Sequence, residues 1–283
     1  MSVMRVAALQ MRSGEMPDTN RSTFETLVRE AAARGARYVQ SPEMTGILVR
    51  DREKLLERIR PEDDDPLVHR AGELAKELSL FVHLGSTAIA LGGGKVANRA
   101  FLFGPDGRQI ATYDKIHMFD VDLDNGESWR ESATYAAGTR AVVAALPFAR
   151  IGLSICYDLR FPQLFSAQAL AGAKVLTAPA AFTRQTGEAH WHVLTRARAI
   201  ENGAWLIAAA QGGQHEDGRE TFGHSLIVDP WGRIVAEATH DEPCVVVADI
   251  EPGASVEARR KIPNLKNIRE FAVTEAVSEE NAS

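Results

Sequence analysis

One order of predicted elements, strand–helix–strand–helix–strand–hairpin, occurs twice along the chain, and this repeat constrains the fold more than any other feature. In each half a Pro-x-Gly-Arg turn joins the strands of the hairpin, within 104–108 and within 229–233. Strands that alternate with helices form a sheet covered by those helices, and hairpins add antiparallel strands to it. The repeat therefore predicts two similar halves, each a sheet with helices on one face.

Packing the two sheets face to face gives an α/β fold, an α-β-β-α four-layer sandwich, which we predict as a single domain over residues 1–271. A doubly wound sheet of the Rossmann type is the alternative, and the many hairpins count against it. Residues 272–283 are predicted to form a polar C-terminal tail. The polar stretch that begins near Ser255 is expected to cross to a partner subunit or to be disordered.

Local signals predict where several elements begin. Ser22 and Glu25 have the spacing of a capping box for the first helix. Asp65 is the candidate cap of the second helix, with Pro66 at its first position. The last predicted strand, residues 245–249, follows the second hairpin and is expected to belong to the second half.

Charge and composition argue against several classes of protein. The chain has 32 Lys+Arg and 38 Asp+Glu, a net charge of −6, without a basic cluster for nucleic acid. Its most apolar stretch, residues 204–210, is far shorter than the roughly 20 residues of a membrane span. Arg5 and Arg12 interrupt the N-terminal apolar run, so no secretory signal is predicted. We expect a cytoplasmic protein that binds neither nucleic acid nor membrane.

Cys156 is the first candidate for chemistry, because it lies between an apolar strand and a helix. A thiol at such a turn points out of the sheet, and the helix N-terminus favours its thiolate. A buried structural cysteine is the alternative, since a thiol nucleophile also needs a base. Glu43 follows a short strand and is expected at the place in the first half that matches Cys156. Lys115 closes another strand, and each of these residues has a surface role as its alternative.

The histidines offer weaker candidates. His83 lies inside an apolar strand and is interpreted as a core residue. His190 shares a helix face with apolar side chains and is interpreted as structural. His190 and His192 together supply only two ligands, which is too few for a metal site. We therefore expect no metal.

An ordered set of motifs runs along the chain: Ser41-Pro-Glu43, Tyr113-Asp-Lys-Ile-His-Met-Phe-Asp120, Glu131-Ser, Gly152-Leu-Ser-Ile-Cys-Tyr-Asp-Leu-Arg-Phe-Pro162, Gly187-Glu-Ala-His-Trp191, Arg196-Ala-Arg-Ala-Ile-Glu-Asn202, Gly223-His-Ser225 and Asp229-Pro-Trp-Gly232. Taken in this order, they resemble the carbon–nitrogen hydrolase (nitrilase) superfamily, and especially its Nit branch of small amidases, from about residue 4 to residue 271. Ser41 departs from the family pattern, which often has an apolar residue there, and this departure bears on local packing.

The resemblance implies that Cys156 is the nucleophile, Glu43 the general base and Lys115 the third catalytic residue, while Glu131 positions the lysine and the substrate. It implies the sandwich fold, a homodimer or higher homo-oligomer, and hydrolysis of a small carboxylic amide through a thioester. Lys115 and the backbone N–H of Tyr157 are expected to hold the oxyanion. Such a mechanism requires no metal or organic cofactor.

The resemblance also implies a substrate class, the ω-amides of 2-oxo acids, with deaminated glutathione first and 2-oxoglutaramate next. These substrates are anions, so the pocket is expected to hold a cation. Arg184 is the candidate ligand for a carboxylate, and Phe182 is the candidate for the pocket wall.

Several alternatives stay open. Arg160, next to the thiol, is expected to pair with Asp158 or Glu201 rather than to bind substrate. A nitrilase, an N-carbamoyl-amine amidohydrolase or an acyl transferase would use the same catalytic residues. A thiol sensor or an inert scaffold would explain the cysteine without turnover.

Overall fold

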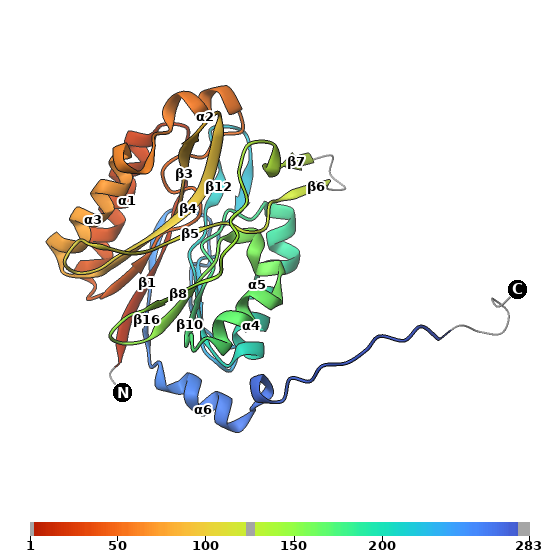
Figure 1. Ribbon diagram of the computed structural model, residues 1–283. Helices are drawn as coiled ribbons and strands as arrows, with labels where there is room; N and C mark the ends of the chain where they lie inside the picture. Colours follow the sequence, from red (N-terminus) through yellow and green to blue (C-terminus); the bar gives the residue numbers. More distant parts are fainter. Residues whose placement is uncertain (1–2, 123–127, 277–283) are drawn as a thin grey trace, which may run out of the picture.

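Two helical layers enclose two packed sheets in the computed structural model, which describes residues 3–122 and 128–276 (Figure 1). The strands of the first sheet are β1 (Met4–Gln10), β2 (Tyr38–Gln40), β3 (Phe81–Gly92), β4 (Lys95–Phe103), β5 (Gln109–Asp114) and β16 (Cys244–Ile250), in the order β16-β1-β2-β3-β4-β5. Helices α1 (Pro17–Ala33) and α3 (Pro66–Leu78) cover its outer face (Figure 1), and α2 (Arg52–Arg58) lies at one end.

The second sheet repeats this arrangement. Its strands are β8 (Val142–Ala145), β9 (Arg150–Leu153), β10 (Val175–Thr177), β11 (Trp205–Ala208), β14 (Leu226–Val228) and β15 (Ile234–Glu237), in the order β15-β14-β11-β10-β9-β8. Helices α4 (Pro162–Leu170) and α5 (Arg184–Asn202) cover its outer face (Figure 1). Two small hairpins, β6 (Asp120–Asp122) with β7 (Ser128–Arg130) and β12 (Gly212–Gln214) with β13 (Glu220–Phe222), lie beside the sheets. The predicted four-layer sandwich is therefore confirmed.

Strand β1 illustrates why a strand inside the sandwich carries apolar residues on both of its faces. Val6 and Ala8 belong to the core between the sheets, while Ala7 and Leu9 belong to the core formed with α1 and α3. Since both faces of the sheet are covered, neither set of side chains meets water. Of the two capping predictions, the one for α3 is right, because the Asp65 carboxylate accepts hydrogen bonds from the first turn.

Two sequence predictions about the halves are wrong. Strand β16 does not join the second sheet but pairs antiparallel with β1, where Val245 lies opposite Leu9 and completes the first sheet. The matching edge strand of the second sheet is β8, next to β9. In addition, Glu43 follows β2, whereas Cys156 follows β9, which corresponds in strand order to β1, so the two do not occupy matching places.

Two further sequence predictions, for the start of the first helix and for the polar stretch near the C-terminus, also need correction. Helix α1 begins at Pro17 rather than near Ser22, because proline is well suited to the first position of a helix. The polar stretch after Ser255 forms helix α6 (Gly253–Lys261), which is docked on the body. Ser255 donates to the Lys174 carbonyl, and Arg259 donates to the carbonyls of Ala173 and Asn202.

Beyond α6 and a short 3-10 turn at Asn264–Lys266, the chain up to residue 276 is exposed and has no regular structure (Figure 1). The domain boundary at residue 271 stays a prediction. No helix within the described ranges is both long and apolar enough to cross a membrane.

Candidate active site

The turn after β2 carries Glu43 into the interior. Ser41 and Thr45 are both buried, and the Thr45 hydroxyl donates to the Ser41 hydroxyl at 2.8 Å. The Gly85 backbone N–H also donates to the Ser41 hydroxyl at 3.0 Å. Ser41 therefore fixes this turn through hydrogen bonds, which explains how a polar residue is accommodated at that position.

The turn after β9 presents Cys156 in a strained conformation. Its φ of 49° lies in the left-handed region, which side chains with a Cβ rarely adopt. The Cys156 backbone N–H donates to the Pro179 carbonyl at 2.8 Å, and a 3-10 helix, Cys156–Arg160, starts here. The first N–H groups of a helix have no partner within the helix. The backbone N–H of Tyr157 belongs to this first turn and can therefore donate to a group bound beside the thiol.

Asp158 links this turn to the segment that carries Lys115. Its fully buried carboxylate accepts hydrogen bonds from the Ile155 N–H at 2.8 Å and from the Tyr113 hydroxyl at 2.6 Å. It also accepts from the His117 backbone N–H at 3.1 Å and contacts the His117 ring at 2.7 Å. One carboxylate thus fixes the turn that carries Cys156 relative to Tyr113 and His117, which lie two residues before and two residues after Lys115.

Lys115 lies between two carboxylates. Its Nζ is 2.9 Å from Glu43 Oε1 and 2.9 Å from both carboxylate oxygens of Glu131. The Asn98 amide donates to Glu43 at 2.8 Å and to Glu131 at 3.3 Å. The Ala181 backbone N–H donates to the second Glu43 oxygen at 3.0 Å, so both oxygens of this base have fixed partners.

Burial and charge set the proton positions at this site. Burial raises the pKa of Cys156 well above its ordinary value, and the negative charge of Glu43 adds to this effect, so the thiol is protonated at rest. Burial alone would also raise the pKa of Glu43, but the Lys115 charge and the hydrogen bonds it receives hold it below its ordinary value. The charges of Glu131 and Glu43 outweigh burial for Lys115 and raise its pKa well above the ordinary value. A neutral thiol therefore faces an ionised carboxylate and an ammonium group.

A cavity of about 270 Å³ opens over these groups, and its wall includes Cys156, Glu43, Lys115, Glu131 and Tyr157. Phe182 lies in the wall, where the sequence placed it. The arrangement suits attack of a thiol on a carbonyl carbon, because a base, a cation and a backbone N–H surround the sulfur.

The arginine that the sequence predicts for a substrate carboxylate does not line the cavity. Arg184 is not in the cavity wall, since it lies on the exposed start of α5 within 4 Å of Glu188, Glu220 and Asp241. Its negative neighbours and its exposure correct the prediction that it binds substrate. Arg160 lines the cavity instead.

The predicted ion pair of Arg160 is also wrong. Asp158 is occupied by the contacts described above, and Glu201 pairs with Arg198 at 2.8 Å. The Arg160 guanidinium lies 5.3 Å from the ring centre of Phe182 and 3.2 Å from His190 Nδ1. Among the residues that the structure describes, it has no carboxylate partner, which leaves its charge available to the cavity.

Sequence reasoning missed further residues of the site. Asn98 lies in a strand that also contains Lys95 and Arg99, so its polarity alone did not single it out. Arg50 and Arg219 also line the cavity, where their guanidinium carbons lie 4.1 Å and 4.8 Å from the ring centre of Trp129. Nothing in the sequence indicates that Arg50, Trp129 and Arg219, far apart in the chain, meet in the cavity wall.

Comparison with known proteins agrees with the site. The family model described as carbon–nitrogen hydrolase matches residues 5–260. The chain belongs to the carbon–nitrogen hydrolase family. A deaminated glutathione amidase from Yersinia enterocolitica is 38% identical over 93% of this chain and 92% of its own length. An omega-amidase from Homo sapiens is 33% identical over 95% of this chain and 96% of its own.

Among solved structures of similar proteins, the C. elegans NitFhit protein has a TM-score of 0.88 and 31% identity, over 95% of this chain and 66% of the worm chain. Nit3 of Saccharomyces cerevisiae, a member of the nitrilase superfamily, has a TM-score of 0.81 and 26% identity over 92% of this chain and 94% of its own. The predicted family and enzyme class, a carbon–nitrogen hydrolase of amidase type, are confirmed.

Proposed function

We propose that the protein hydrolyses the terminal amide of a small 2-oxo carboxylic acid, with Cys156 as nucleophile and deaminated glutathione as the first candidate substrate. The observation that carries this proposal is the convergence of the thiol with Glu43 and Lys115 at one cavity. A scaffold or thiol sensor would not need a buried lysine held between two carboxylates, since burying such charges is costly.

In the proposed reaction, the Glu43 carboxylate accepts the thiol proton as sulfur attacks the amide carbon. The oxygen that becomes negative is held by the Lys115 ammonium group and the Tyr157 backbone N–H. Glu43 then gives its proton to the leaving nitrogen, and the C–N bond breaks as the tetrahedral intermediate collapses to the thioester. The leaving group is ammonia from 2-oxoglutaramate or cysteinylglycine from deaminated glutathione. Water enters, loses a proton to Glu43 and attacks the thioester, which releases the acid and restores the thiol.

Glu131 is proposed as a positioning residue. It accepts two hydrogen bonds from Lys115, and its Oε2 accepts the Phe119 backbone N–H at 2.7 Å. Since its side chain is only 12% exposed, this carboxylate keeps the ammonium group at a fixed place in the cavity wall. Its role is exerted through Lys115 rather than on the substrate.

The charge of the cavity supports an anionic substrate. Arg160 has no carboxylate partner within the described ranges and suits a carboxylate group of the amide substrate. Arg50 adds a second positive charge to the cavity wall and suits a second carboxylate of a longer substrate, whereas Arg219 in the same wall is paired with Asp217 at 3.0 Å. Deaminated glutathione carries two carboxylates, whereas 2-oxoglutaramate carries one and is shorter. Deaminated glutathione, the longer anion, is therefore the first candidate substrate.

The test is hydrolysis of a panel of deaminated glutathione, 2-oxoglutaramate, a neutral amide, an N-carbamoyl amine and one nitrile, followed as 2-oxoglutarate release for the two 2-oxo amides and as ammonia release for the others. We expect turnover of the two 2-oxo amides and its loss in Cys156→Ala. Cys244→Ala is the matched control, since the second thiol is remote from the cavity wall. Turnover only of the nitrile or of the carbamoyl compound would contradict the substrate class. Full activity of Cys156→Ala would overturn the mechanism.

We also propose that the protein forms a homodimer through the second helical layer. Val193 and Ile200 lie two turns apart on α5 and are 67% and 51% exposed, and Leu170 of α4 is 59% exposed. Exposed apolar side chains that gather on one face favour protein contacts. Light scattering should give twice the mass of one chain, and Val193→Asp should lower it. A cytoplasmic location stays a prediction.

A further inference from the structure

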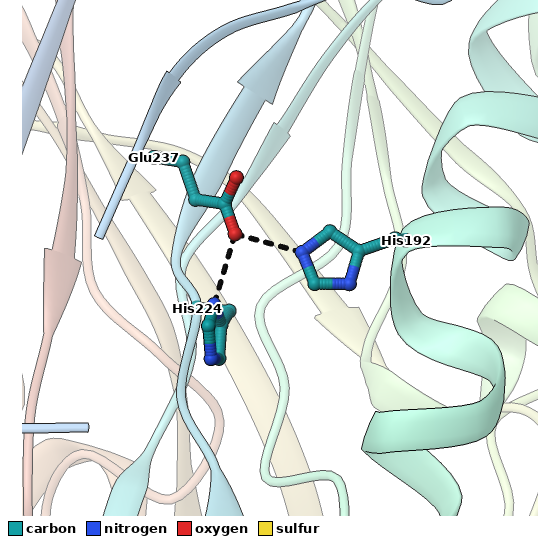
Figure 2. A group of neighbouring side chains, drawn as sticks. All are labelled: His192, His224 and Glu237. Atoms are coloured by element: carbon teal, nitrogen blue, oxygen red, sulfur yellow. Dashed lines mark hydrogen bonds and ion pairs between the residues drawn. The ribbon is translucent and has the colours of Figure 1, made fainter. Parts of the chain in front are cut away.

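A second group of side chains with metal-binding chemistry lies where α5, β15 and the segment between β13 and β14 meet. It consists of His192, His224 and Glu237, and Figure 2 shows both imidazole rings directed at one carboxylate. His192 Nε2 lies 2.7 Å and His224 Nδ1 lies 2.9 Å from the same oxygen, Glu237 Oε1. None of the three lines the active-site cavity. We propose that these residues form a binding site for a divalent transition metal ion, with Zn²⁺ as its first candidate.

The distances allow such a site with little movement. The three ligand atoms lie within 4.8 Å of one another. Zinc bonds of about 2.0–2.2 Å in tetrahedral geometry place ligand atoms about 3.3 Å apart. The two nitrogen–oxygen distances therefore need to lengthen by about 0.5 Å, and the nitrogen–nitrogen distance, at most 4.8 Å, needs to shorten by no more than about 1.5 Å, within reach of side-chain rotations. Two imidazoles and one carboxylate match the ligand set of zinc sites that keep a fourth position for water.

The surroundings hold His224 in place. Its backbone has a φ of 56°, and the Trp191 indole N–H donates to its carbonyl at 2.8 Å. The Phe222 ring stacks on the His224 ring with centres 4.3 Å apart, and it meets the His192 ring edge-on at 5.7 Å. Phe222 thus gives the site an apolar wall, which excludes water from one side and fixes both rings.

Access also favours an ion. The His192, His224 and Glu237 side chains are 33%, 26% and 23% exposed, so an ion reaches them without unfolding.

The site would connect three separate elements through one ion. Helix α5 begins beside Thr183 and includes Thr186, both of which line the active-site cavity. Phe182, in the same wall, packs against Trp191 with ring centres 5.1 Å apart. Bound metal would therefore stabilise the position of α5 and of the cavity wall that continues from it.

The test is zinc titration of the full-length protein by isothermal titration calorimetry at pH 7.5, after dialysis against a chelator. It is performed on the Cys156→Ala/Cys244→Ser variant, in which no thiol remains to bind zinc. We expect one Zn²⁺ per chain with a Kd in the micromolar range or below, and a rise in Tm on zinc addition. Co²⁺ at the same site should give the visible absorption of a tetrahedral ion without a sulfur charge-transfer band.

Two variants in the same background distinguish the proposed ligands from adventitious binding. His192→Gln keeps a side chain that can donate to Glu237 but removes the imidazole, and Glu237→Gln removes the charge. Each should weaken zinc binding more than tenfold and abolish the rise in Tm, with an unchanged circular dichroism spectrum. His69→Ala, on the exposed side of α3, is the matched control and should bind zinc as before.

Absence of saturable zinc uptake by the thiol-free protein would overturn the proposal. So would uptake that is unchanged in both His192→Gln and Glu237→Gln. If one variant fails to fold, His224→Asn replaces it, because asparagine tolerates the left-handed backbone at that position. None of these readouts depends on amidase activity, so failure of the proposed function would leave this result unaffected.

Discussion

The two sheets have the same strand order, yet the side chains at matching places differ. In the first half, the Lys115 backbone N–H donates to the Asn98 carbonyl at 3.0 Å, just beyond the β4–β5 hairpin. In the second half, the Ala238 N–H donates to the Ser225 carbonyl at 2.9 Å, just beyond β14–β15. The backbone hydrogen bond is repeated, but the amine of Lys115 in the first half corresponds to the methyl group of Ala238 in the second.

This difference shows that, among the described residues, the duplicated topology does not duplicate the active-site side chains. The first half contributes the buried base and cation, Glu43 and Lys115, and the second half contributes the thiol of Cys156 and the arginine at position 160. Ion pairs in a protein interior depend on every partner, since an unpaired buried charge is costly. We therefore expect substitutions in the first half to affect both stability and catalysis, and those in the second half to affect mainly catalysis.

The largest expected effect tests this division directly. Lys115→Met should lower kcat/KM by roughly 10²–10³, because it removes a donor to the oxyanion. It should also lower the free energy of unfolding by about 3–5 kcal/mol, because Glu43 and Glu131 lose their buried partner. Steady-state kinetics and urea unfolding measure the two effects.

Lys54→Met is the control for that variant. Lys54 forms an exposed ion pair with Glu15 at 3.0 Å, so its loss should change the unfolding free energy by less than about 1 kcal/mol. A Lys115→Met protein as stable as the wild type would contradict the division between the halves.

The second prediction concerns the arginines of the second half. Arg160→Gln should raise KM for a 2-oxo amide about 10–100-fold, because it removes a charged hydrogen bond to the substrate carboxylate. KM for a neutral amide should change little. Arg184→Gln is the matched control and should behave as the wild type, because Arg184 lies outside the cavity wall. Equal changes in KM for both variants would show that Arg160 does not determine the substrate specificity of the cavity.

The third prediction follows from the pKa directions of Glu43 and Cys156. The pKa of Glu43 lies below its ordinary 4.5, so its basic form persists through neutral pH and is lost only as pH falls through that lowered pKa. Below it, kcat/KM should fall about tenfold for each pH unit. The pKa of Cys156 is raised above its ordinary 9.0, so the thiol should stay protonated at pH 9.

Absorbance at 240 nm, compared between the wild type and Cys156→Ala, measures the thiolate directly. A thiolate signal at pH 7 would indicate an ion pair in the resting enzyme and would rule out Glu43 as the base that ionises the thiol.

The smallest expected effect concerns backbone strain at the thiol turn. Cys156 has a φ of 49°, a conformation that glycine adopts without a steric penalty. Cys156→Gly should therefore be more stable than Cys156→Ala by about 0.5–1 kcal/mol, once the greater freedom of glycine in the unfolded chain is included. Thermal unfolding of the two inactive variants tests this. A less stable glycine variant would mean that the turn is not strained.

Much of the fold could be predicted from the sequence, because the signals are local. The Asp65-Pro66 pair specifies the start of α3, and the Pro-x-Gly-Arg turns specify the hairpins. The Ser22 signal failed because Pro17 provides a competing start for α1 five residues earlier. The motif residues Glu43, Lys115 and Cys156 could also be named, but their meeting at one cavity could not be deduced from spacing.

The sequence by itself determined the repeat, the turns, the cap of α3 and the residue types that chemistry requires, because these depend on neighbours within a few positions. The tertiary structure decided that β16 completes the first sheet, that Arg160 rather than Arg184 faces the cavity, and that His192 meets His224 and Glu237. Each of these outcomes depends on contacts between residues distant in the chain. Such contacts are fixed by the packing of two sheets and their helices, which no local pattern encodes.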